Sequence, residues 1–450
     1  MAATDQELET QIAQWRDFIG RRREIGADVD ELEAHLRDRI EALAASGLSN
    51  DEAFLVAVKR LGRIDELSRE FAREHSERLW KQLVIGDTGK TGRRDSGLTV
   101  ALVFAVIAGA IIKLPALFGL SLETSADVYL RNAALLLLPM LAGYFLVRRR
   151  AHATTIIGVV VPFIAAGALL NAYPFAADGM TELLAAVHAV VALWIVAGIA
   201  YANGDWRSGA ARMDLIRFTG EWVVYFVLLA LGGGVLAALT IGVFLAVGVD
   251  AFPFVTEWML PCGAAGAVVV AAWLVEAKQS VIENIAPVLT RVFTPLFTMM
   301  LLVLIGTAVV QRTVVDADRD LLIIFDLVLI VTLGLLLYSL SARNPDAPAS
   351  WFETMQLVLV IAALVVDVFV LAAMLGRIGT YGASANKLAS LGLNLILLVN
   401  LAGAAWLQLR FLRGKERFTA LERWQTAYVP VYLAWAAIVV IVFPPVFAFA

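Results

Sequence analysis

Four polar side chains interrupt apolar stretches of this 450-residue chain: Lys113, Asp326, Asp367 and Asn394. Charged groups are costly to place in a membrane and often mark an ion or substrate pathway. One hypothesis is a polar chamber open to the outside, in which Asp326 or Asp367 exchanges a proton or binds a cation and Lys113 is their counter-ion. The alternative is that Lys113 snorkels to the membrane surface while each aspartate makes an interhelical hydrogen bond.

The stretches that must position these residues are long enough to cross a bilayer. A span needs about 20 mostly apolar residues, and no period-two alternation suggests strands, so we expect helices. The fold class is therefore an all-α, polytopic helical membrane protein with about eleven transmembrane helices, within a range of 10–12. The predicted spans are 98–118, 128–147, 154–172, 181–202, 220–247, 257–277, 292–311, 320–341, 353–375, 388–411 and 427–447.

Loop charges predict how these spans are oriented. With the N-terminus inside, fourteen Lys and Arg residues lie in or beside the inner loops and five on the outer side. The positive-inside rule then favours a cytoplasmic N-terminus and, with an odd number of spans, an external C-terminus. At 1.5 Å per residue, the four polar residues fall into one layer roughly 8–12 Å beneath the outer boundary.

Charge is distributed unevenly along the chain. Only 17% of all residues are charged, against about 25% in soluble domains, yet residues 1–95 hold 20 of the 40 acidic and 16 of the 36 basic side chains. We predict a small cytoplasmic helical bundle over 1–83, a linker over 84–97 and a transmembrane domain over 98–450. The net charge of −4 and the lack of a dense basic stripe give no support for nucleic-acid binding.

The segment from Ser46 to Gly62 has the features of a complete short helix. Ser49 and Glu52 have capping-box spacing, and an apolar face follows, formed by Phe54, Leu55, Val58 and Leu61. This is one of four short amphipathic helices expected in the bundle, the last starting near Asp65. Their apolar stripes should pack on one another. The same helix is also a candidate docking element for a cytoplasmic regulatory protein.

Signatures of enzymes and metal sites are missing. The sequence holds no H-E-x-x-H or G-x-S-x-G motif, and Gly89-Lys90-Thr91 lacks the earlier glycine of a phosphate-binding loop. His188 stands alone, and one imidazole cannot make a metal site. The single cysteine, Cys262, excludes an intrachain disulfide. We therefore expect no enzyme activity, cofactor or metal. The acidic N-terminus is not a cleavable signal peptide, so the first span should direct insertion.

Two further segments suggest local structure. Gly232, Gly233 and Gly234 would allow close helix packing or a break in span 220–247. The segment from Arg413 to Tyr428 is amphipathic and predicts a helix along the inner membrane surface.

Three segments carry a family resemblance. D-E-L-E-A-H-L-R-D-R-I-E-A-L-A-A-S-G-L-S-N-D-E-A-F-L-V-A-V-K-R-L-G (30–62) resembles the permease prefix (HAAS-type) domain of bacterial membrane proteins, over about residues 5–75. Segments 273–297 and 388–432 are similar to the DUF4153 family, most clearly over 220–450. The first resemblance implies a cytoplasmic regulatory or docking role, with PadR-like regulators as partners. The second implies no established activity and no functional residue.

Two classes of function remain open. The first is a permease-like transporter, or a component of one, regulated by residues 1–83. The second is an envelope sensor that relays a signal to a cytoplasmic, PadR-like regulator. Both would sit in the lipid bilayer of the bacterial cytoplasmic (inner) membrane as multi-pass proteins with a cytoplasmic N-terminus.

Overall fold

The computed structural model describes residues 8–13, 15, 16, 29–45, 49–61, 95–176, 179–277, 285–311, 319–345 and 347–450. Within these residues the chain is helical and contains no strand. The chain divides into two compact units, Met1–Arg94 and Asp95–Ala450. The division falls inside the predicted linker.

The first unit contains helical residues 8–13 and 15–16 together with α2 (Val29–Ala45) and α3 (Asn50–Leu61). The capping box at the start of α3 is confirmed. The Ser49 amide donates to the Glu52 carboxylate at 3.0 Å, and the Glu52 amide donates to Ser49 Oγ at 3.4 Å. The predicted fourth helix lies outside the described residues.

Apolar side chains from all described helices of the first unit form one core. Trp15 is fully buried there, and it belongs to a cluster with Leu36, Ile40, Phe54 and Val58. The amphipathic stripes of the sequence thus pack on one another, because burial of these faces stabilises helices that are too short to be stable alone.

The second unit contains eleven helices long and apolar enough to span a membrane within the described part of the chain, one for each predicted span. They confirm the polytopic all-α fold. The helices are α5 (Asp95–Ile111), α6 (Ala126–Arg148), α7 (Ala153–Ala172), α8 (Thr181–Tyr201), α9 (Gly209–Ala246), α11 (Leu260–Ala277), α13 (Ile285–Gln311), α14 (Arg319–Ser341), α15 (Trp351–Tyr381), α16 (Ala385–Leu412) and α17 (Phe418–Ile441). Short elements extend some of them: η1 (Pro115–Phe118) follows α5, α10 (Phe252–Phe254) and the π-helical η2 (Val255–Met259) precede α11, and α18 (Phe443–Val446) follows α17.

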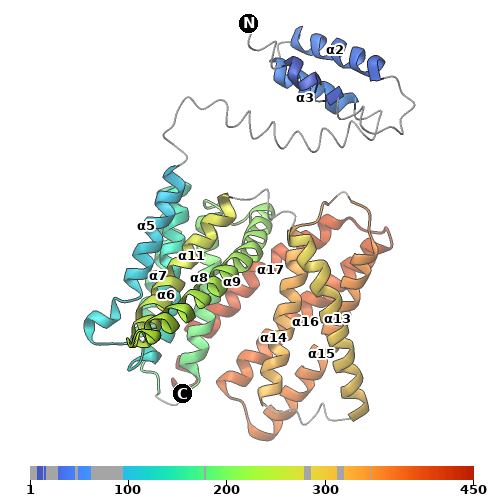
Figure 1. The fold of residues 1–450 in the computed structure, drawn as a ribbon. Helices are drawn as coiled ribbons and strands as arrows, with labels where there is room; N and C mark the ends of the chain where they lie inside the picture. The colour runs from blue at the N-terminus through green and yellow to red at the C-terminus, as the bar shows by residue number, and fades with distance from the viewer. Residues whose placement is uncertain are drawn as a thin grey trace. The chain divides into compact units, whose positions relative to one another are not determined.

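These helices form two bundles with separate cores, which Figure 1 shows side by side. The N-terminal half comprises α5–α11 (95–277), and the C-terminal half comprises α13–α17 (285–441). The last long helix connects them, because α17 packs against both α8 and α16. Near its start Phe418 and Leu421 join the core of the C-terminal half, and near its end Val440 joins that of the N-terminal half.

Two glycines of α16 set the close approach of α17. A Cβ added at Gly392 would overlap the ring of Trp435, and one at Gly403 would overlap the ring of Trp424. The two glycines are eleven residues apart on α16, and the two tryptophans are eleven residues apart on α17. Eleven residues are about three helical turns, so the same glycine–indole contact occurs twice along this antiparallel pair of helices. Small residues allow helix backbones and large side chains to come together in membranes, where packing drives helix association.

Two local predictions are wrong. Helix α9 is continuous over 38 residues, and nothing lies within 4 Å of a Cβ built on Gly232, Gly233 or Gly234. These glycines therefore make neither a break nor a close contact within the described structure. The amphipathic segment after Arg413 is not a separate surface helix either. From Phe418 onward it forms the first turns of α17, and its apolar face packs into the C-terminal half.

Candidate functional site

Three of the four predicted polar residues come from neighbouring helices of the C-terminal half. Asp326 lies on α14, Asp367 on α15 and Asn394 on α16, and each of these helices packs against the other two. Consecutive antiparallel helices return to the same membrane depth, so residues at matching distances from their ends can meet. Asp367 and Asn394 are 0% exposed, and Asp326 is 9% exposed.

The carboxamide of Asn394 joins two of these helices. Its Nδ2 donates to Asp326 Oδ1 at 2.8 Å and to the carbonyl of Ser390, one turn earlier on α16, at 2.9 Å. Both N–H groups of the amide are thus used, which fixes its orientation. Asn394 Oδ1 is buried and has no hydrogen-bond partner among the described residues. The amide therefore holds Asp326 in place and keeps one acceptor unused.

Asp367 is the unusual member of this group. Both of its carboxylate oxygens are buried without a hydrogen-bond partner in the described structure. Asp326 is a second buried carboxylate, and it lies on α14, which packs against α15. Burying an unpaired charge is costly, and a second negative charge increases that cost. A proton or a bound cation at the Asp326–Asp367 pair would remove it.

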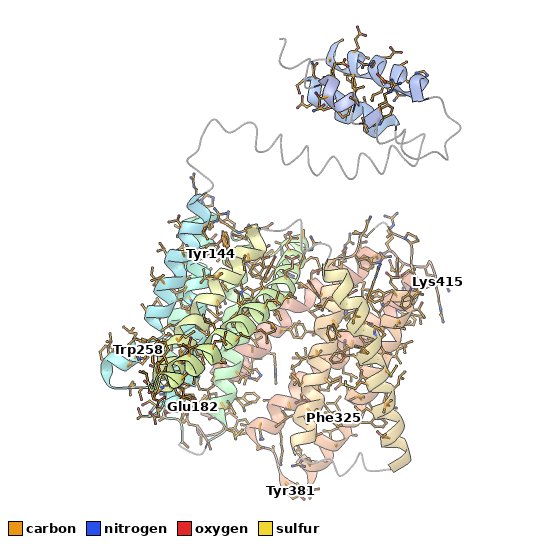
Figure 2. All side chains as sticks on the ribbon, in the orientation of Figure 1. Tyr144, Glu182, Trp258, Phe325, Tyr381 and Lys415 are labelled. Atoms are coloured by element: carbon orange, nitrogen blue, oxygen red, sulfur yellow. The ribbon has the colours of Figure 1, made fainter. Side chains whose placement is uncertain are left out.

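Lys113 does not join the other three residues. It follows the end of α5, which packs on α6 and α11 in the N-terminal half. Its Nζ lies 4.6 Å from the centroid of the Trp258 ring, a cation–π contact. Figure 2 shows Trp258 in one bundle and Phe325, the neighbour of Asp326 in sequence, in the other. Of the two hypotheses for Lys113, the one that makes it the counter-ion of the aspartates is therefore wrong, because a shared depth does not make helices neighbours.

A second polar cluster, which the sequence analysis missed, lies toward the other end of the same helices. Arg343 Nε donates to Glu353 Oε1 at 2.8 Å, and Gln408 Nε2 donates to the carbonyl of Glu353 at 3.0 Å. Gln356 donates to Ser339 Oγ. A signal was present, because S-x-x-E at 350–353 is a capping box and the structure contains it at the start of α15.

Arg343 is held by more than this ion pair. Its guanidinium lies 4.9 Å from the Phe411 ring and 4.5 Å from the Phe418 ring, and it donates to the backbone carbonyls of Asn344, Ala347 and Pro348. This cluster is well partnered, in contrast to the aspartate pair, and we interpret it as structural.

Two amides between these clusters are buried without side-chain partners. Asn400 on α16 and Gln425 on α17 are 0% and 1% exposed, and neither carboxamide has a hydrogen-bond partner among the described residues. The backbone carbonyl of Asn400 accepts a hydrogen bond from Trp424 at 3.0 Å. The C-terminal half thus holds unpaired polar groups at more than one depth.

The remaining predicted residues have structural roles where they are described. Phe54 and Val58 lie in the core of the first unit, so their side chains cannot also form a docking face. The side chains of Leu55 and Leu61 lie outside the described residues. His188 contacts the carbonyl of Leu184 through Nδ1 at 2.8 Å. Among the described residues, no three His, Cys, Asp or Glu side chains are placed to hold a metal ion.

The chain matches no family model, no curated protein and no solved structure.

Proposed function

We propose that this protein is a permease-like transporter in which the Asp326–Asp367 pair binds the coupling cation or proton. The observation that supports this proposal is the carboxylate of Asp367, which is 0% exposed and has no hydrogen-bond partner in the described chain. An ionisable group inside a membrane bundle is rare and costly, and such groups characterise ion and proton pathways. Asn394 donates a hydrogen bond to the second carboxylate, that of Asp326.

The orientation and the role of the first unit belong to the same proposal. The excess of basic residues in the predicted inner loops supports a cytoplasmic N-terminus in the bacterial inner membrane. The resemblance of residues 5–75 to a permease prefix domain supports regulation of the transmembrane domain by this unit. Because Phe54 and Val58 are core residues, a cytoplasmic partner would bind the polar side of α3 rather than its apolar stripe.

Charge movement tests the proposal without knowledge of the substrate. The full chain is reconstituted in liposomes on a solid-supported membrane and exposed to jumps of pH, Na⁺ or K⁺. We expect a transient current for at least one of these cations, because its binding inside the membrane displaces charge. Asp367→Asn and Asp326→Asn should each abolish the current.

Asp214→Asn is the matched control. Asp214 is exposed near the start of α9, far in sequence from the aspartate pair, and its replacement removes the same charge. The current should survive in this variant. Identical currents in the wild type and both aspartate variants, or no current with any of the three cations, would refute the proposal.

The sensor remains the second candidate, supported by the first unit being compact and distinct from the membrane-spanning unit. Deletion of residues 1–92 separates the two. A permease keeps its cation-induced current in liposomes without this unit. A sensor loses only a transcriptional response in cells, and its transmembrane domain gives no such current.

A further inference from the structure

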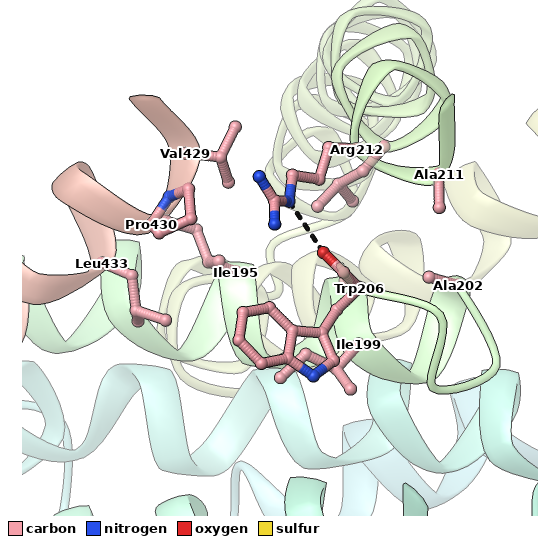
Figure 3. Close-up of a pocket in the computed structure, with 11 residues that line it drawn as sticks. Ile195, Ile199, Ala202, Trp206, Ala211, Arg212, Val429, Pro430 and Leu433 are labelled. Carbon is pink, nitrogen blue, oxygen red and sulfur yellow. Dashed lines mark hydrogen bonds between the residues drawn. The ribbon is translucent and has the colours of Figure 1, made fainter. Parts of the chain in front are cut away.

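A small apolar pocket opens between α8, α9 and α17 in the N-terminal half. Figure 3 shows side chains from all three helices around it. The cavity measures about 30 Å³, where a single water needs about 10–15 Å³. It can therefore take part of a flexible chain but not a whole drug-sized ligand. Its apolar lining includes Ile195, Ile199, Leu215, Val429, Pro430 and Leu433.

Among the described residues that line this pocket, Arg212 alone is charged. It donates to the carbonyls of Trp206 at 2.7 Å, Thr426 at 3.1 Å and Arg207 at 3.3 Å; Figure 3 shows the first of these bonds. A guanidinium has five N–H groups, so two remain for another acceptor. No carboxylate of the described chain forms an ion pair with Arg212.

A second cation and an indole ring stand beside Arg212. The guanidinium carbon of Arg207 lies 5.5 Å from the centroid of the Trp206 ring, and that of Arg212 lies 5.9 Å from it. Trp206 is 40% exposed, and Arg207 is exposed. Tryptophan is enriched at the level of lipid headgroups. Arginine is suited to phosphate because its planar fork can donate two parallel hydrogen bonds.

The polar and apolar parts of the pocket lie at different heights along α8. Trp206 and Arg207 lie in the turn between α8 and α9, beyond the end of α8 at Tyr201. Ile195 lies seven residues before Ala202 on α8, which is about 10 Å deeper along the helix. With α8 spanning the bilayer, the charges would lie at the membrane surface and the apolar lining below them.

We propose that this pocket binds one anionic phospholipid. Its phosphate would accept hydrogen bonds from Arg212 and Arg207, and the first part of an acyl chain would enter the cavity while the rest stays in the bilayer. Charge complementarity favours an anionic lipid, because two arginines that form no ion pair within the described chain attract a net negative headgroup more strongly than a zwitterionic one. The site is independent of the aspartate pair and of any transport activity.

Native mass spectrometry of the delipidated full chain tests this proposal, with phosphatidylglycerol and phosphatidylcholine titrated in parallel. The wild type should bind one phosphatidylglycerol more tightly than phosphatidylcholine. Arg212→Gln and Arg207→Gln should each weaken phosphatidylglycerol binding about fivefold, as expected for one arginine at a lipid surface. Ala202→Leu, which fills the cavity without changing charge, should weaken binding of both lipids.

Arg413→Gln is the control, because Arg413 is exposed at the predicted inner end of α16 and does not line the pocket. Its affinity for phosphatidylglycerol should equal that of the wild type. Arg207→Gln should fold normally even if Arg212→Gln does not, because the Arg207 side chain is exposed and makes no hydrogen bond in the described chain. Equal affinity for the two lipids, unchanged binding in both arginine variants, or displacement of the lipid by millimolar inorganic phosphate would overturn the proposal.

Discussion

The two halves of the transmembrane unit differ in whether their buried polar side chains have hydrogen-bond partners. In the N-terminal half Tyr144 donates to Glu276 at 2.8 Å, Trp194 donates to Thr219 at 3.1 Å, and Trp222 donates to a backbone carbonyl at 2.9 Å. The exceptions are Thr181 and single atoms of the Arg131–Glu182 ion pair. In the C-terminal half, by contrast, whole side chains are buried without partners, as in Asp367, Asn400 and Gln425.

This difference suggests that the N-terminal half contributes mainly to stability and that a functional site should be sought in the C-terminal half. Buried polar groups in native proteins are almost always hydrogen-bonded, because an unpaired group is costly. A protein retains such groups when they do something that packing does not, and functional sites commonly reduce stability. The N-terminal half has the features of a packed scaffold, whereas the C-terminal half has those of a site.

The largest expected effect concerns the aromatic core of the N-terminal half. Phe145 is 1% exposed, and its ring lies 5.3 Å from that of Tyr201 and 5.4 Å from that of Phe218. Phe145→Ala should lower the free energy of unfolding by about 3–5 kcal/mol, because a large cavity forms. Reaction of a maleimide dye with Cys262 during heating reports unfolding of this half. Phe244→Ala, at an exposed position of α9, should change stability by less than about 0.5 kcal/mol.

The second prediction tests the unpaired carboxylate. Asp367→Leu should raise the free energy of unfolding by about 1–3 kcal/mol, because a buried acidic group is replaced by an apolar one of similar size. Tyr144→Phe should lower it by about 1–2 kcal/mol, because Glu276 loses a hydrogen-bond donor. Thermal unfolding in detergent, followed by tryptophan fluorescence, measures both changes. If both variants lose stability, the contrast between the halves does not hold.

The third prediction concerns glycines in the two halves. Gly403→Ala should destabilise the protein by about 1–3 kcal/mol, because the added methyl group overlaps the ring of Trp424. Gly233→Ala in α9 meets no atom within 4 Å and should stabilise the helix by about 0.5–1 kcal/mol. Thermal unfolding distinguishes the two signs. A neutral Gly403→Ala would contradict the close packing of α16 on α17.

The smallest effect is expected in the first unit, whose charged pairs are exposed. Hydrogen bonds from Arg16 and Arg37 hold the pKa of Glu33 below its usual value of 4.5, and one from Arg37 lowers the pKa of Glu9. A carboxyl whose folded pKa is lowered stabilises the fold above its unfolded pKa. That stabilisation is lost as the pH falls through the folded pKa.

The protection of backbone amides in α2 and α3 against hydrogen exchange should therefore be constant above about pH 5 and should decrease below pH 4.5. The expected size is about 0.5 kcal/mol for each pair, because water screens exposed charges. Arg37→Ala should remove much of this pH dependence, whereas Arg39→Ala, at an exposed position of the same helix, should not. Equal pH dependence in both variants would contradict this assignment.

Local features of this protein follow from the sequence alone. Eleven apolar segments predict eleven helices, because a bilayer core of fixed thickness leaves backbone groups no other partners. The Ser49–Glu52 capping box is local as well, since its atoms are three residues apart. Counting residues from the helix ends also placed Asp326, Asp367 and Asn394 at a common depth.

Only the tertiary structure decided which helices are neighbours. In lipid a helix can be apolar on every side, so hydropathy does not show which side faces a partner. Depth therefore grouped Lys113 with the aspartates, although α5 and α14–α16 belong to different halves. Because hydropathy does not identify helix neighbours, the sequence also did not predict the contacts of Gly392 and Gly403 with two tryptophans. Nor did it predict that α17 lies between the bundles. Composition determines that these helices enter the membrane, but the fit of their side chains determines where the unpaired Asp367 lies.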